Sequence, residues 1–452
     1  MRLYAKHPQV KTLAALLKDK KMRKAAISGF TQSSIAMNFA ATGCKVPLLF
    51  IMRDADEAGY LYQDLKSLSI APLFFPSSYK RAVKFGQKDA AGEVMRAETL
   101  IALTDNSQLS TLNSQLIIVT YPTALSELVA SRQTIDNRML TLRKGETTEL
   151  DVLVTKLREL GFVEVDYVYE PGQFAVRGSI VDIYSFSSEQ PYRIDFFDDE
   201  IDTMRSFDVE SQLSKEMLDS VTIVPEIAKG ANDKIPFLDL LPDDTVIVTN
   251  DTQYVIDAID YIYKEGFSKQ ALSDRLTGVT EADKAEIMRE LTASLNLCKA
   301  STFAKAMERF RVIENGNVNG NLQPPTSNLK SQTSPQPLFH KNFELLAQTL
   351  SDYQTKGYQT FICSDSDKQI ERLKEIFNNE ELRINSSLNF NKGTLHEGYI
   401  DDVLKIVLFT DHQIFERFHK YQLKGQQAKR GKMALTMKEL QEMEPGDFIV
   451  HV

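Results

Sequence analysis

The sequence is poor in cysteine and has no long apolar segment. Its three cysteines, Cys44, Cys298 and Cys363, form no CxxC pair, which excludes a paired-cysteine zinc ribbon and provides no disulfide framework. No apolar run approaches the roughly 18 residues that a membrane-spanning helix needs, and the opening MRLYAKHPQV has no apolar signal core. These absences predict a soluble protein of the reducing cytoplasm that does not enter a membrane.

The chain also lacks an excess of positive charge. It has 62 Asp and Glu against 53 Lys and Arg, a formal net charge of -9, which argues against unspecific binding to nucleic-acid phosphates as its main role. A plain DNA-binding module would therefore depend on a local basic groove. No cofactor, metal site or catalytic nucleophile is predicted, because no metal-ligand spacing is found among the six histidines, His7, His340, His396, His412, His419 and His451.

What the sequence does contain is an α/β pattern long enough for about three domains at the usual domain size. Residues 25–28 predict a strand, 33–41 a helix and 46–52 a buried strand. The alternation continues with a helix at 56–68 and strands at 72–75 and 116–120. This order predicts a parallel sheet covered by helices, whose first part we place at residues 1–124.

An α+β insert is predicted at residues 125–224. A helix at 149–160 precedes short alternating strands around 174–184 and 192–197, and the acidic turn Asp198–Glu200 closes a hairpin. The apolar strand 246–249 and a long helical stretch at 281–314 then resume the first domain, which we extend over residues 225–337.

Residues 316–337 are rich in Asn, Gly, Ser, Pro and Gln, so they predict an irregular linker. A small α/β domain of unknown role is predicted at 338–415, from helices at 343–350 and 368–377 and strands at 360–363 and 403–409. Residues 416–442 predict a basic helix, which could touch nucleic acid or RNA polymerase but is more typical of a solvated linker.

The strand, loop and helix at residues 25–41 have the layout of a phosphate-binding loop, in which glycines and a helix N-terminus cradle phosphates. After Gly29, however, the expected glycine is Ser34, the lysine is Ile35 and the magnesium-binding hydroxyl is Ala36. The loop alone is also compatible with a chance run of small residues, which turns favour.

A second segment supports the nucleotide-site interpretation. Strand 246–249 runs into Asn250 and Asp251, where a helicase of this layout would carry Asp-Glu to hold magnesium and activate water. An amide is a poorer magnesium ligand, and a shortened carboxylate misplaces the base. We therefore predict a degenerate nucleotide site formed by both segments.

The predicted hairpin strand Tyr192–Phe197 carries an unusual face. Strand alternation places Arg193 and Phe197 together on one face, with Asp195 between them, and Arg177 on the preceding strand adds a second positive charge. Arginine beside an aromatic residue is typical of interface hot spots. The alternative is a solvated face with Phe197 folded under the hairpin.

The runs EPGQFAVRGSIVDIYSF and PYRIDFFDDEIDTMRSFDVESQ, between Glu170 and Gln212, resemble the UvrA-binding domain shared by UvrB and the transcription-repair coupling factors. MEPGDFIVHV, residues 443–452, resembles the start of the RNA-polymerase-interacting domain of the coupling factors alone. The two degenerate segments also follow the coupling factors. The resemblance implies that Arg177, Arg193 and Phe197 contact UvrA.

The resemblance implies a multidomain α/β fold, in which a degenerate UvrB-like domain is interrupted by the UvrA-binding insert and followed by the small domain. The implied function is a non-catalytic module that recruits UvrA and links stalled RNA polymerase to nucleotide excision repair. In the full-length family, an ATP-dependent translocase also contacts RNA polymerase and DNA, and the absence of its motor predicts a truncated chain. The rival is an active UvrB-like DNA helicase, which needs a lysine at the position of Ile35.

Overall fold

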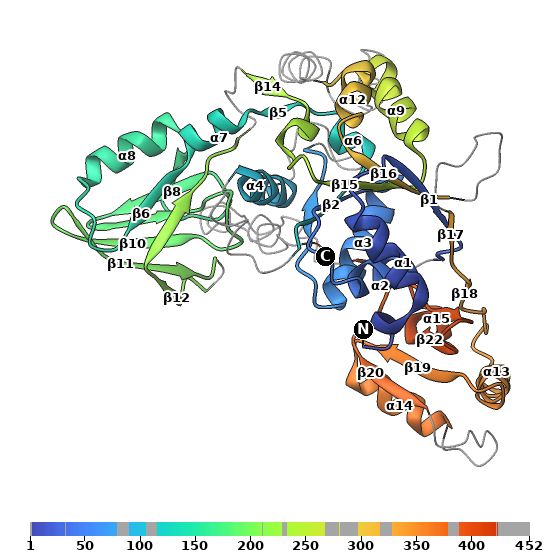
Figure 1. Cartoon of the computed structure of the whole chain (residues 1–452). Helices are drawn as coiled ribbons and strands as arrows, with labels where there is room; N and C mark the ends of the chain where they lie inside the picture. Colours follow the sequence, from blue (N-terminus) through green and yellow to red (C-terminus); the bar gives the residue numbers. More distant parts are fainter. Residues whose placement is uncertain are drawn as a thin grey trace. The chain divides into compact units, whose positions relative to one another are not determined.

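The computed structural model describes residues 2–31, 33–78, 90–104, 115–209, 211–227, 233–266, 280, 297–316, 328–377, 388–421 and 423. The chain divides into two compact units (Figure 1). Unit 1 comprises Met1–Ser77, Asp105–Leu128 and Pro236–Leu423, and the described residues of unit 2 lie within Ser78–Thr104 and Val129–Ile235. Within the described residues, no helix is both long and apolar enough to cross a membrane.

Unit 1 is built on a seven-stranded parallel sheet. Its order is β17 (Asn328–Lys330), β1 (Lys24–Ser28), β16 (Arg311–Asn315), β15 (Val246–Thr249), β2 (Leu48–Ile51), β4 (Ile117–Thr120) and β3 (Leu73–Phe75). Every residue of β2, β4 and β15 is buried, as expected for parallel strands covered on both faces. The five strands that the apolar runs predict in this part of the chain are confirmed.

Helices of unit 1 start where the sequence provides caps. The Asp54 carboxylate accepts hydrogen bonds from the amides of Asp56 and Glu57 at the start of α3, satisfying amides that have no partner within the helix. The helical elements around this sheet are η1 (Tyr4–Lys6), α1 (Pro8–Lys18), α2 (Ser34–Ala41), α3 (Ala55–Ser67), α6 (Pro122–Leu125), η2 (Phe237–Leu240), α9 (Thr252–Tyr261), the π-helical η3 (Ile262–Gly266) and α12 (Ala300–Met307).

Two sequence predictions in this unit are wrong where the structure describes them. The helical stretch 281–314 ends at α12, because Arg311–Asn315 form β16 between β1 and β15; residues 281–296 lie outside the described residues. The irregular linker 316–337 is described only from residue 328 and contains β17 and β18 (Thr333–Pro335). Pairing with existing sheets outweighs the weak strand preference of these polar residues.

Unit 1 also contains the helices and parallel strands of the predicted small α/β domain. Its sheet has the order β18, β21 (Tyr399–Asp401), β22 (Ile406–Thr410), β19 (Gln359–Ser364) and β20 (Asn389–Lys392). The last three strands are parallel and β21 is antiparallel to both neighbours. Its helices are α13 (Phe343–Thr355), α14 (Asp367–Phe377) and α15 (Asp411–Ile414).

The small sheet packs directly on the helices of the parallel sheet. The Tyr4 hydroxyl donates to Asp401 at 2.9 Å, and the Tyr60 ring stacks on His396 with 3.4 Å between ring centroids. Residues 417–421 and 423 are not helical. The rest of the predicted basic helix, and residues 443–452, lie outside the described residues.

Unit 2 is an α+β structure around a six-stranded sheet. The sheet has the order β12 (Ser214–Leu218), β11 (Glu200–Phe207), β10 (Tyr192–Phe197), β9 (Ile180–Ile183), β8 (Gln173–Arg177) and β7 (Val163–Glu164), antiparallel except between β7 and β8. Around it lie α4 (Ala90–Thr104), α7 (Arg132–Arg138), α8 (Leu150–Glu159) and the short pairs β5 (Val129–Ala130) with β14 (Lys234–Ile235) and β6 (Leu140–Arg143) with β13 (Ser220–Ile223). The predicted helix and hairpin of this region are confirmed.

One face of the six-stranded sheet forms the core of unit 2. Helix α8 contributes Leu153, Val154 and Leu157 to a cluster that includes Ile194 and Phe196 from β10, and α8 lies along the sheet in Figure 1. Because strand residues alternate between faces, this core directs the neighbouring residues of β10 to the opposite face.

Candidate functional site

The loop between β1 and α2, described except at residue 32, has the strand, loop and helix order of a phosphate-binding loop, but another part of the chain lies against it. Gly29 has a φ of 73°, a left-handed conformation that favours glycine. A Cβ at Gly29 would lie 2.3 Å from the Ser331 carbonyl oxygen, and the Ser331 amide donates to the Ser28 carbonyl at 2.6 Å. The segment between β17 and β18 therefore packs against the loop.

Thr333 satisfies the polar groups of this loop. Its hydroxyl oxygen accepts hydrogen bonds from the Thr31 amide at 3.1 Å and the Thr31 hydroxyl at 2.9 Å. It donates to the Gly29 carbonyl at 2.7 Å and lies 3.3 Å from the Ser34 hydroxyl. An amide that a nucleotide phosphate would use in such a loop is thus bonded to the protein's own side chain.

The side chains at the positions where a phosphate-binding loop would carry its glycine, lysine and hydroxyl are part of the core. Ser34, Ile35 and Ala36, the first residues of α2, are buried. An isoleucine in the place of the lysine has no charge to offer a phosphate, and an alanine has no oxygen for magnesium. The structure places all three in the first turn of α2, directly after the loop that contains Gly29.

The residues after β15 serve local structure. The Asp251 carboxylate caps α9, accepting from the amides of Gln253 at 2.8 Å and Tyr254 at 3.1 Å. The Asn250 side-chain amide donates to the Glu57 carboxylate at 3.0 Å. Within the described residues, no group of three or more His, Cys, Asp or Glu side chains is arranged to hold a metal ion.

In unit 2, the face of the sheet opposite α8 carries the predicted arginines. Strand register pairs Arg193 of β10 with Asp182 of β9 and with Arg205 of β11. Arg177 of β8 follows Ala175, which also pairs with Asp182. Residues that are directly opposite one another share a face, so Arg177, Asp182 and Arg193 lie together.

Asp182 connects the two predicted arginines. Its Oδ1 accepts from Arg193 Nε at 2.7 Å, and its Oδ2 accepts from Arg193 Nη2 at 2.9 Å. The same Oδ2 also accepts from Arg177 Nη2. The Asp182 side chain is only 1% exposed, against 34% for Arg177 and 14% for Arg193, so one buried carboxylate holds two guanidinium groups.

Aromatic rings support the same guanidinium groups. The Arg193 guanidinium carbon lies 4.4 Å from the centre of the buried Phe207 ring, and that of Arg177 lies 5.0 Å from the exposed Tyr167 ring. The hydrogen bonds to Asp182 raise the pKa of Arg193 above its ordinary value, against the lowering effect of burial. The Arg193 guanidinium is therefore charged, and both arginines are held in place.

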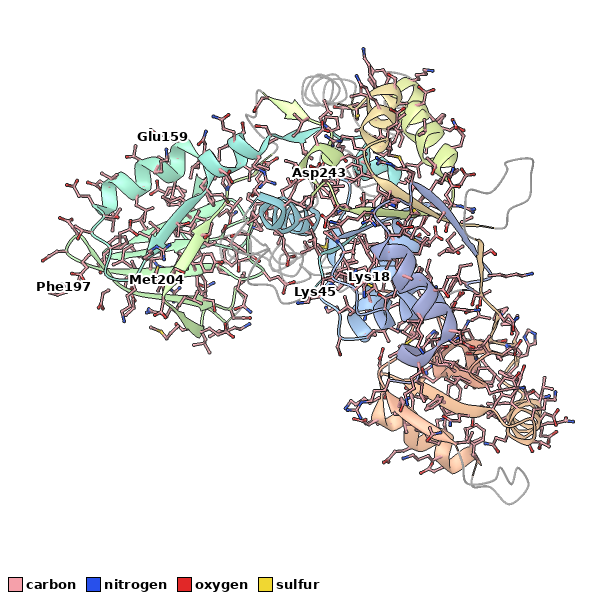
Figure 2. The ribbon with its side chains drawn as sticks, in the orientation of Figure 1. Lys18, Lys45, Glu159, Phe197, Met204 and Asp243 are labelled. Atoms are coloured by element: carbon pink, nitrogen blue, oxygen red, sulfur yellow. The ribbon has the colours of Figure 1, made fainter. Side chains whose placement is uncertain are left out.

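Phe197 is exposed at the tip of β10. Its side chain is 75% exposed, and Figure 2 labels it at the end of the hairpin, beyond the ribbon. Asp198, with a φ of 51°, begins the turn to β11, and Phe197 pairs with Glu200 across it. The alternative in which Phe197 folds under the hairpin is wrong, whereas the pairing of both arginines with a local carboxylate is observed.

Asp182 and Thr333 were not predicted from the sequence. Asp182 had a signal, because a carboxylate between Val181 and Ile183 in an apolar strand needs a positive partner. Thr333 had none, since its partners in the loop are 299 to 304 residues away in the sequence.

The region of unit 2 that contains this arrangement is similar to a known domain family. Residues 140–228 match the family model of the UvrB interaction domain, and this range contains Arg177, Asp182, Arg193 and Phe197. A parallel sheet with a phosphate-loop layout, joined to this domain, defines a UvrB-like multidomain α/β protein.

Several transcription-repair-coupling factors are similar to the chain. That of Escherichia coli (strain K12) is 39% identical over 118 residues, which cover 26% of this chain and 10% of that protein. That of Bacillus subtilis (strain 168) is 20% identical over 492 residues, covering 95% and 41%. That of Staphylococcus aureus (strain bovine RF122 / ET3-1) is 23% identical over 385 residues, covering 73% and 33%.

The chain is a relative of the amino-terminal region of the transcription-repair coupling factors. It spans less than half the length of the relatives compared above, from 10% to 41% of each.

Proposed function

We propose that this chain is a non-catalytic module that recruits UvrA to nucleotide excision repair through the six-stranded sheet of unit 2. The observation that carries the proposal is the matched UvrB interaction domain at residues 140–228, whose sheet face opposite α8 carries Arg177, Arg193 and Phe197. An exposed phenyl ring at the end of the strand that carries the held Arg193 suits a partner with an apolar pocket and carboxylates nearby.

The test is binding of the 452-residue chain to purified UvrA, measured by surface plasmon resonance. Arg177→Ala, Arg193→Ala and Phe197→Ala should each weaken binding by roughly thirtyfold, the loss expected for a hot spot worth about 2 kcal/mol. Val152→Ala, on α8 and 57% exposed, is a control on the other side of the sheet and should bind as the wild type does. Equal affinity of all four variants would refute the proposal.

We further propose that the nucleotide site is inactive, and that the chain neither binds nor hydrolyses ATP. Two features support this. Ile35, Ala36 and Asn250 lack the groups that compensate phosphate charge and hold magnesium, and Thr333 bonds to the Thr31 amide in the loop. A nucleotide would have to displace the segment between β17 and β18.

Isothermal titration of the chain with magnesium-ATP checks this proposal. We expect no heat of specific binding for the wild type or for Thr333→Gly, which opens the loop but restores no lysine. Saturable micromolar binding to the wild type, lost when Gly29 is changed to Val, would instead support the rival function of an active UvrB-like helicase.

The wider role in the cell follows from the relatives and is part of the same proposal. In a full-length coupling factor, a module of this kind would be joined to parts that contact RNA polymerase and DNA, and UvrA bound to it would be brought to the stalled polymerase. We expect this to take place in the cytoplasm. Co-precipitation of UvrA with RNA polymerase, dependent on Phe197, would test the link.

A further inference from the structure

The sheet face of unit 2 opposite α8 places like charges next to one another. Arg193 and Arg205 are direct cross-strand partners, an arrangement that is destabilising when nothing lies between the charges. Two carboxylates offset this repulsion, since Asp182 binds Arg193 and Arg177 while Asp195 binds Arg205. The two carboxylates differ in burial, because Asp182 is 1% exposed and Asp195 is 22% exposed.

Asp182 cannot contact a partner directly, because its side chain is buried and both of its oxygens are already hydrogen-bonded. Both of its oxygens accept from arginine side chains, and the carboxylate is covered by the groups that it holds. Its effect on the outer surface is therefore indirect. Asp182 accepts hydrogen bonds from Nε and Nη2 of Arg193, and Nη1 of the same guanidinium group is 3.4 Å from the Gln212 carbonyl oxygen.

We propose that Asp182 is a positioning residue for partner binding, which fixes the guanidinium groups of Arg177 and Arg193 in the orientation that the partner's carboxylates recognise. This inference rests on the proposed UvrA-binding function. A guanidinium group that is already fixed loses less side-chain freedom on binding. Without the carboxylate, two adjacent positive groups would repel each other and adopt several rotamers.

The test combines Asp182→Asn with a double-mutant cycle, using the 452-residue chain and purified UvrA. Asp182→Asn keeps the size of the side chain but removes the charge and one acceptor, and should weaken binding by about tenfold. In an Arg193→Ala background its effect should fall to about threefold or less, because the main group that it positions is gone. In a Phe197→Ala background the tenfold effect should persist.

A merely structural role predicts another pattern. It would reduce affinity by the same factor in the Arg193→Ala and Phe197→Ala backgrounds, whatever the change in melting temperature, and this result would overturn the inference. Glu164→Gln is the matched control, because Glu164 binds Arg158 at 2.6 Å in an exposed pair of the same unit. Its affinity for UvrA should equal that of the wild type.

Arg193→Lys provides a second variant if Asp182→Asn does not fold. Lysine keeps the charge but cannot form two parallel bonds with a carboxylate, so affinity should fall nearly as far as in Arg193→Ala. Wild-type affinity of Arg193→Lys would show that charge alone matters and would refute a positioning role. If the wild type itself does not bind UvrA, the proposed function fails; if the arginine variants weaken binding and Asp182→Asn does not, only this inference fails.

Discussion

Phe197 and Arg193 lie on the same face of the sheet but differ in how far they are buried, and therefore in their expected contribution to stability. Phe197 is 75% exposed, so Phe197→Ala should change the free energy of unfolding by less than about 0.5 kcal/mol, while UvrA binding weakens. Urea denaturation of the variant beside the wild type checks this. A stability loss above about 1 kcal/mol would show that the ring packs in the free chain.

Arg193→Ala should behave differently because the Arg193 side chain is only 14% exposed. Removing it leaves the buried Asp182 with Arg177 as its described ion-pair partner, and breaking a buried pair costs about 3 kcal/mol. An arginine on a solvated face would be replaced with little loss of stability, but this pair is buried. Urea denaturation should show the loss, and the same stability as Phe197→Ala would contradict it.

At the scale of elements, the segment between β17 and β18 is held by Thr333. Thr333→Val removes the hydroxyl but keeps the shape, leaving the Thr31 amide and the Gly29 carbonyl without this partner. The free energy of unfolding should fall by about 1 to 3 kcal/mol. Thr349→Val is the control, because its exposed hydroxyl donates within α13 to the Leu345 carbonyl. Equal melting temperatures for the two variants would mean that Thr333 does not hold the segment.

The elements differ in how far the sequence could predict them. Strands such as β2 and β15 are continuous apolar runs, and β10 alternates between apolar and charged residues up to Phe196, so both patterns identify their strands. Strands β16 to β18 were missed because their pairing partners lie far away in the sequence, and no local pattern records such a partner. For the same reason, strand alternation predicts the shared face of Arg193 and Phe197 but not the burial of Asp182 beneath the arginines.

At the scale of the whole molecule, unit 1 buries titratable groups where its two sheets meet. The His396 amide donates to the Asp64 carboxylate at 2.6 Å, and the Ser33 hydroxyl, which accepts from the Glu397 amide at 3.0 Å, also bonds to Asp64. Burial raises the pKa of Asp64 to about 7. Burial and the nearby His412 and His419 lower the pKa of His396 to about 4.

These two groups have opposite effects on stability over the same pH range. Folded Asp64 keeps a proton that the unfolded chain loses above about pH 3.8, so its contribution to stability falls as pH rises to about 7. In the unfolded chain His396 binds a proton below about pH 6.5, whereas in the folded chain it stays neutral until the pH falls to about 4. Its contribution to stability therefore rises as pH increases from about 4 to 6.5. Between about pH 4 and 6.5 the two contributions oppose each other.

Asp64→Asn should leave the contribution of His396 to the pH dependence of stability unopposed. Asparagine resembles the protonated carboxyl, so the free energy of unfolding should rise from pH 4.5 to 6.5 more steeply than in the wild type, by at most about 1.4 kcal/mol per pH unit. His396→Phe, which keeps a ring against Tyr60, should do the reverse and become less stable as pH rises. Urea denaturation across this pH range measures the free energy of unfolding of both variants and of the wild type. Subtracting the wild-type values cancels the contributions of the titratable groups that all three proteins share. Curves parallel to the wild type would show that neither group titrates differently in the folded chain.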